Sequence, residues 1–135
     1  MIMSLKISSL FLLCSFAVQA QLAVTVLPVK FTGQKADVLL VMTNNLADSV
    51  ASARAVCFLL DDQGKMAGQT TKWVIGGTKD RPSLPPKCGA TFNFVITSPH
   101  PWATTNLTAK VSLIRVVLDN GKLLDPDKDA RIDSQ

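Results

Sequence analysis

Two adjacent carboxylates, Asp61 and Asp62, follow the apolar run CFLL and come shortly before Gly64. Paired carboxylates work as general acid and base only when a pocket holds them apart and separates their pKa values. Neighbours at the end of a strand instead point to opposite sides and face solvent. Asp accepts hydrogen bonds from backbone amides two residues further on, and glycine adopts positive φ easily. The stretch therefore predicts a turn and not a catalytic pair.

Cysteines are the next candidates for chemistry. Cys14 falls in an amino-terminal segment that we expect to be removed, which leaves Cys57 and Cys88. Two cysteines in an exported chain favour one disulfide bond. It would close a loop of about 30 residues and stabilise the fold by about 3 to 4 kcal/mol in the loop-entropy account. Two buried free thiols that behave as small apolar side chains are the alternative. There is no Cys-x-x-Cys motif to indicate a redox function.

The segment DPDKDARID near the carboxyl end has a spacing of acids similar to that of a calcium loop. Its acidic residues are Asp125, Asp127, Asp129 and Asp133. Ala130 stands where such a loop needs glycine, and no Glu follows to act as a bidentate ligand. The four acids are therefore a weak candidate for a divalent metal site. The simpler expectation is that residues 125–135 form a polar, partly disordered tail.

His100, between two prolines, is the only histidine. A metal site built from several histidines is therefore excluded, and a Ser-His-Asp triad would depend on His100 alone. No serine lies in a G-x-S-x-G motif. We predict that the chain is not an enzyme, that it needs no cofactor, and that His100 is a loop residue with at most a role in binding.

Trp73 and Trp102 are the remaining candidates for binding, because exposed aromatic rings stack on sugars or anchor a protein partner. Trp102 follows the sequence SPHP, which predicts a loop, whereas Trp73 lies within a predicted strand. The alternative for Trp102 is a loop side chain that covers one end of the core.

The first 20 residues have the features of a signal peptide. Lys6 provides the positive charge, LFLLCSFAV is the apolar stretch, and small residues precede a cut after Ala20. The apolar stretch is shorter than the roughly 20 residues that a membrane-spanning helix needs. We expect the mature chain to begin at Gln21, to have no transmembrane segment, and to be periplasmic or extracellular.

Removing 20 of the 135 residues leaves 115, which is enough for one domain. The net charge of +4 becomes +3 without Lys6. Every acidic residue is Asp, a residue of turns and caps, and the strong helix former Glu is absent. The basic residues are dispersed and have no interleaved aromatics, so nucleic-acid binding is not expected.

The mature chain alternates short β-type segments with turn signals and shows no sustained helical period. The predicted strands are residues 22–27, 38–43, 50–60, 65–75, 91–96, 107–118 and 122–124. Residues 61–64 predict a hairpin turn, and the glycines and prolines of residues 76–89 predict a long surface loop. About seven strands in roughly 100 residues indicate an antiparallel, immunoglobulin-like β-sandwich over residues 21–124. A small closed barrel is the alternative.

The strand around Cys57 and the segments after it follow a pattern similar to that of a known family. Leu59 and Asp61 match a short motif, while Cys57 and Leu60 replace its phenylalanine and tyrosine. A glycine turn and a Leu-Pro loop follow, before a strand that carries phenylalanine. Residues 44–94 thus resemble the FxLYD-type domains, small exported sandwich domains of bacteria. The resemblance covers less than half of the chain and implies a fold and no activity.

The predicted function is therefore a non-enzymatic binding or assembly module of the bacterial cell envelope. Such a module would engage another envelope protein through its loops or through an open sheet edge. A glycan-binding accessory module that uses an exposed loop tryptophan is the alternative, and a small hydrolase that depends on His100 is a third hypothesis.

Overall fold

The structure is a computed structural model and describes residues 21–135. The predicted signal peptide, with Cys14, lies outside the described residues. In chain order the elements are β1 (Leu22–Val26), β2 (Lys30–Thr32), β3 (Lys35–Asn44), β4 (Val50–Leu60), β5 (Met66–Ile75), β6 (Gly89–Thr97), β7 (Thr108–Leu118), α2 (Pro126–Asp129) and β8 (Ala130–Ser134).

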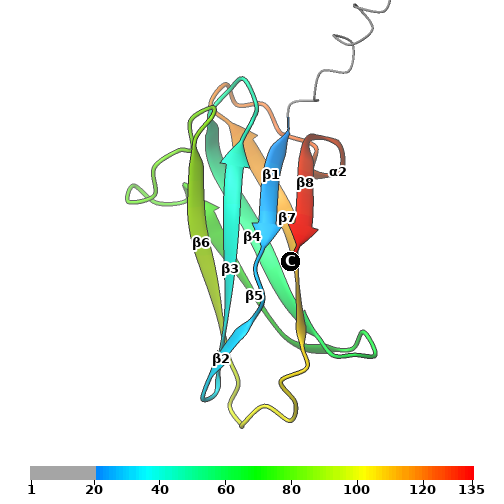
Figure 1. Cartoon of the computed structure of the whole chain (residues 1–135). Helices are drawn as coiled ribbons and strands as arrows, with labels where there is room; N and C mark the ends of the chain where they lie inside the picture. The colour runs from blue at the N-terminus through cyan, green and yellow to red at the C-terminus, as the bar shows by residue number, and fades with distance from the viewer. Residues whose placement is uncertain (1–20) are drawn as a thin grey trace, which may run out of the picture.

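The strands form two sheets, one in front of the other in Figure 1. In the five-stranded sheet, β6, β3, β1 and β8 are neighbours in that order, and β2 also pairs with β3. The three-stranded sheet has the order β5-β4-β7. The strand pairs are antiparallel, except that β8 runs parallel to β1. The prediction of an all-β chain is confirmed, and the strands form two sheets rather than one closed barrel.

One hydrophobic core lies between the sheets, because alternate residues of β1, β3, β4, β6 and β7 point inward. The five-stranded sheet contributes Leu40, Met42 and Phe94, and the three-stranded sheet contributes Leu59 and Val111. Burying each of the larger side chains stabilises the fold by about 1.5 to 3 kcal/mol.

The prediction of a turn at Asp61 and Asp62 is confirmed. The Oδ1 atom of Asp61 accepts hydrogen bonds from the backbone N–H groups of Gln63, at 2.9 Å, and Lys65, at 2.8 Å. Gly64 has a φ of 78°, which glycine adopts with little strain. The Asp61 carboxylate therefore holds the β4–β5 hairpin closed.

We expect Asp61→Ala to lower the free energy of unfolding by about 1 kcal/mol, because two backbone donors lose their acceptor. Thermal or urea denaturation measures this change. Asp62→Ala is the matched control, since Asp62 is exposed and its side chain makes none of these bonds. Equal effects of the two substitutions would contradict this account of the turn.

The buried side chain of Asn44 fixes the long loop that follows β5. Its Nδ2 atom donates to the carbonyl oxygens of Asp48 and Leu84, each at 2.9 Å, and its Oδ1 atom accepts from the N–H of Leu46, at 2.9 Å. Leu84 is also bonded through both backbone groups to Val50 at the start of β4. The predicted loop is thus anchored at its centre to both sheets.

The expectation of a partly disordered tail after residue 124 is wrong. Asp125 caps helix α2 by accepting a hydrogen bond from the N–H of Asp127 at 3.0 Å. Residues Ala130–Ser134 then form β8, which pairs with all of β1. Polar side chains do not prevent this, because β8 is held by its backbone and most of its side chains face solvent.

Two smaller corrections concern short strands. The sequence did not predict β2, whose three residues pair with the start of β3. Residues 122–124 were expected to form a strand, but only an isolated bridge between Val117 and Leu123 is present there. Both segments are too short for a pattern of alternation to be read from the sequence.

Within residues 21–135, no helix is long and apolar enough to cross a membrane.

Candidate binding cleft between strands β5 and β6

Two unpaired strand edges lie on the same side of the molecule. Among residues 21–135, strand β6 pairs only with β3 and β5 pairs only with β4, so each has one free edge. A cleft of about 350 Å³ lies between these strands and is bounded by the loop of residues 80–84. Free edges present unpaired N–H and C=O groups and are the usual places where another chain adds a strand.

The hydrogen bonds of β6 show which of its backbone groups face away from β3. The N–H of Asn44 donates to the carbonyl of Cys88, and the N–H of Ser98 donates to the carbonyl of Gln34. In an antiparallel ladder, the residues that bond the partner strand alternate with residues whose backbone groups point outward. The even-numbered residues of β6 therefore bond β3, and Thr91, Asn93 and Val95 direct their backbone groups toward the free edge.

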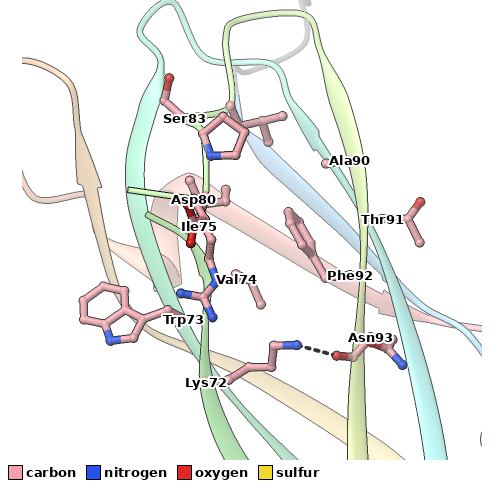
Figure 2. A pocket seen from close by; sticks show the side chains of 13 residues that line it. Lys72, Trp73, Val74, Ile75, Asp80, Ser83, Ala90, Thr91, Phe92 and Asn93 are labelled. Carbon is pink, nitrogen blue, oxygen red and sulfur yellow. Dashed lines mark hydrogen bonds between the residues drawn. The ribbon is translucent and has the colours of Figure 1, made fainter. Parts of the chain in front are cut away.

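The floor of the cleft is apolar. Val74 and Ile75 of β5 and Leu84 of the loop are buried, and Phe92 of β6 is half-buried. Figure 2 shows the Phe92 ring in the space between β5 and β6. A surface of this kind can take an apolar side chain from an extended partner segment while the strand edge binds its backbone.

Lys72 closes the lower part of the cleft. Its Nζ atom donates a hydrogen bond of 2.8 Å to the outward carbonyl of Asn93 (Figure 2). The same Nζ atom lies 5.7 Å from the centroid of the Phe94 ring, within the range of a cation–π contact. Lysine at a strand edge is a common device against unwanted pairing, because its charge opposes the approach of an arbitrary strand.

The charged side chains at the loop end of the cleft are Asp80 and Arg81. The Nη1 atom of Arg81 donates to the carbonyl of Gly76, at 3.4 Å, and to the Oγ1 atom of Thr78, at 3.3 Å. These long bonds turn the guanidinium back toward its own loop. The cleft thus has polar groups at both ends and an apolar centre.

Trp73, one of the predicted binding residues, lies at the border of this cleft. It is half-buried, and Figure 2 shows its ring on the opposite side of β5 from Lys72 and Phe92. The ring therefore belongs to the outer face of the three-stranded sheet. The position of Trp73 next to Lys72 in the sequence indicates this orientation, since consecutive strand residues point to opposite faces.

Trp102 and His100 lie in the loop between β6 and β7, and neither lines the cleft. The Trp102 ring packs on Phe31 with 5.8 Å between ring centroids and 69° between planes. It is half-buried against the core, and its Nε1 atom is buried without a hydrogen-bond acceptor among the described residues. Trp102 therefore covers one end of the core, while His100 is exposed.

Both Cys57 and Cys88 are free thiols in this structure, so the predicted disulfide between them is not formed. Cys57 lies in the middle of β4, opposite Thr70 and Val111, and its side chain is in the core. Cys88 is exposed on the turn before β6. The alternative of a buried free thiol holds for Cys57 and not for Cys88.

The acids of the carboxyl-terminal segment do not gather into a metal site. Among residues 21–135, no group of three or more His, Cys, Asp or Glu side chains could hold a metal ion. Asp125 caps the helix, Asp129 accepts a bond from the N–H of Asp125 at 3.1 Å, and Asp133 pairs with Arg131 at 3.0 Å. Asp127 stays in the first turn of the helix. Two of the four acids, Asp125 and Asp129, thus bond local backbone N–H groups.

The sequence did not predict Lys72, Phe92 and Asn93 as site residues. The alternation of TFNFVI placed Phe92 inward and Asn93 outward, but nothing local showed that β6 is a free edge or that β5 lies across from it. That information depends on which strands pair over long distances in the chain.

Comparisons with known proteins give no family. No protein-family model and no curated protein matches the chain. Among solved structures, it is similar to IrmA from Escherichia coli, with 12% identity, a TM-score of 0.47, and coverage of 87% of this chain and 92% of the other. It is also similar to the structural-genomics target SoR45, with 11% identity, a TM-score of 0.45, and coverage of 78% and 77%. The resemblance to FxLYD-type domains stays a prediction.

Proposed function

We propose that this chain is an exported, non-enzymatic binding or assembly module of the bacterial cell envelope. In this proposal it has an immunoglobulin-like sandwich fold, and an extended segment of a protein partner adds to the free edge of β6. Export rests on the signal-peptide features of residues 1–20. The sandwich assignment is supported by two mainly antiparallel sheets that share one core.

The observation that carries the proposal is the free edge of β6 beside an apolar cleft. Thr91 and Asn93 direct backbone groups outward, and Phe92, which lies between them, faces the cleft. In strand addition, main-chain hydrogen bonds provide affinity, and pockets for alternate side chains provide specificity. The free edge of β6 supplies the groups for main-chain hydrogen bonds, and the cleft supplies a pocket for a side chain.

A bound strand would have to replace the hydrogen bond between Lys72 and the carbonyl of Asn93. That bond is exposed to solvent, so losing it costs about 1 kcal/mol. A backbone N–H of the partner can take over the same carbonyl. Lys72 would then restrict binding to segments that compensate for its displacement.

A glycan-binding function has less support. It needs an exposed aromatic ring in a loop, and the Trp102 ring packs on Phe31 with its N–H buried. Protein binding through the β6 edge is therefore the function that we propose.

Thr91→Pro tests the proposal, because proline removes an outward N–H from β6 without removing a bond to β3. Thr91→Val is the matched control, since it changes the side chain and keeps the N–H. A photo-crosslinking residue at Val95 would be used to capture envelope proteins in wild-type and variant backgrounds. We expect Thr91→Pro to lower the yield of specific adducts about tenfold or more, and Thr91→Val to preserve it.

Equal adduct yields from the proline and valine variants would contradict strand addition at this edge. Circular dichroism and thermal unfolding of both variants show whether the fold is retained. If Thr91→Pro unfolds the protein, Lys72→Met provides the second test: it frees the Asn93 carbonyl and should increase the yield.

A further inference from the structure

The outer face of the three-stranded sheet contains a second hollow, which shares Trp73 with the lining of the cleft between β5 and β6. It has a volume of about 780 Å³ and crosses all three strands near Arg54 of β4. Trp73 of β5, Ile114 and Arg115 of β7, and Leu123 after β7 line it as well. This hollow contains two cations beside apolar side chains, and no acidic residue of the described part of the chain lines it.

Arg54 and Arg115 lie directly opposite each other in the β4–β7 ladder. Like charges at opposite positions of an antiparallel pair destabilise a sheet. Among residues 21–135, the one salt bridge joins Arg131 to Asp133, so neither arginine of this pair has an acidic partner there. The pair therefore opposes folding slightly, and its location favours a role in binding an anion.

Irregular pairing on both sides of Arg54 creates the hollow. Ala53 pairs with Ile75 and Arg54 with Trp73, which leaves Val74 as an extra residue in β5. On the other side, Ile114 is the extra residue between Arg115 and Leu113. Bulges redirect side chains, and here Ile114 and Arg115 are both exposed although they are consecutive in a strand.

The Trp73 ring holds one of the arginines. The guanidinium carbon of Arg54 lies 6.0 Å from the centroid of the Trp73 ring, as in a cation–π contact. The loop after β5 supports the ring, since a Cβ atom on Gly77 would lie only 2.6 Å from the Cγ atom of Trp73. Arg54 is thus positioned in advance of any ligand, which reduces the loss of side-chain entropy on binding.

Apolar side chains beside the arginines restrict the ligand further. Ile114 is 49% exposed and Leu123 is 57% exposed, so both present apolar surface to solvent within the hollow. An ordinary inorganic anion would leave this surface uncovered. The ligand that fits both features carries negative charges next to apolar groups.

We propose that this hollow binds an acidic segment of a protein partner in which carboxylates alternate with apolar side chains. Arginine forms planar, bidentate pairs with carboxylates, and Ile114 and Leu123 would cover the intervening apolar groups. Binding to an anionic membrane surface typically uses clusters of about four to eight basic residues. This hollow contains two, Arg54 and Arg115. Two arginines opposite each other match a short acidic segment better.

The probe is a fluorescein-labelled peptide of sequence Gly-Ser-Glu-Phe-Glu-Leu-Ser-Gly, and its counterpart has Gln in place of each Glu. Fluorescence anisotropy measures binding to the full mature chain. We expect Arg115→Gln, or the use of the Gln peptide, to weaken binding about tenfold or more. Lys110→Gln removes the same charge from the same strand outside the hollow and should change affinity less than about twofold.

Binding that is equal for Arg115→Gln and wild type, or for the Glu and Gln peptides, would overturn the proposal. Binding to phosphatidylglycerol vesicles in preference to the peptide would also overturn it and would assign the hollow to a lipid surface. Thr91→Pro should leave peptide binding unchanged, so failure here is distinguishable from failure of strand addition at β6.

Thermal unfolding without peptide provides an independent readout. If the arginine pair serves binding rather than folding, Arg115→Gln should raise Tm by about 1 to 5 °C at low salt, and added salt should reduce this gain. A lower Tm for Arg115→Gln than for Lys110→Gln would give the arginine a structural role and overturn the proposal.

Discussion

Asn44→Ala should lower the free energy of unfolding by about 2 to 4 kcal/mol, because it removes the three hydrogen bonds of a buried side chain. The Asp48 carbonyl loses this donor and the Leu46 N–H loses its acceptor, while the Leu84 carbonyl keeps its bond from the Val50 N–H. Asn44 is fully buried, and it is the one buried polar side chain among the described residues. Urea denaturation followed by tryptophan fluorescence measures the change.

Asn45→Ala is the matched control, since this neighbour is exposed and its side chain forms none of these bonds. It should change stability by less than about 0.5 kcal/mol. Hydrogen exchange at the N–H of Leu84 provides a local readout, because the loop that bounds the cleft should open more often in Asn44→Ala. A small stability loss shared by both variants would mean that water replaces the Asn44 side chain.

The strands with strong alternation could be predicted from sequence alone. Residues 50–60 were expected to be a strand, and β4 has the same bounds. Its inward positions at Ala53, Ala55, Cys57 and Leu59 carry small or apolar side chains. In such a strand the residue types follow the pattern of burial, because one face of the sheet must cover the core.

Strand β8 could not be predicted by the same reasoning. Ala130 is half-buried and the other residues of β8 are exposed, so the sequence of β8 shows no alternation of apolar and polar residues. Its stability depends on backbone pairing with β1, which begins more than a hundred positions earlier in the chain. Acidic and basic side chains on an exposed edge strand are expected, since they discourage association with other sheets.

The two candidate binding surfaces have the same origin in long-range pairing. Lys72 and Asn93 meet because β5 and β6 are edge strands of different sheets. Arg54 and Arg115 meet because β4 and β7 pair in one particular register. The sequence contained all four residues, but only as dispersed polar positions, because a register that shifts at a bulge cannot be read from local spacing.

The two thiols should differ strongly in reactivity. In the folded protein at pH 8, Ellman's reagent should modify Cys88 rapidly, because that side chain is exposed. Burial raises the pKa of the Cys57 thiol from 9.0 to about 11. That shift alone makes the reactive thiolate about a hundredfold scarcer, and burial in the core hinders the reagent further. We expect one fast thiol per chain of residues 21–135, and a second only after unfolding.

The same shift makes stability depend on pH in a defined direction. Because the pKa of Cys57 is higher in the folded state than in the unfolded state, the folded state retains the proton more firmly. The associated stability is fully present below pH 9.0 and is lost as pH rises toward about 11. At the upper end of this pH range, the loss in the free energy of unfolding is about 2 to 3 kcal/mol. Cys57→Ala lacks this dependence, so the stability difference between wild type and variant should narrow over that range.

Cys88→Ser is the control for the fast phase of modification. This variant should lose the fast phase, and its unfolded form should still yield one thiol, from Cys57. Absence of any modifiable thiol in both folded and unfolded wild type would show a disulfide and contradict the free thiols of this structure. Two fast thiols in the folded protein would show that the core opens readily around Cys57. In that case β4, which pairs with both β5 and β7 at this position, could not form a stable centre of its sheet.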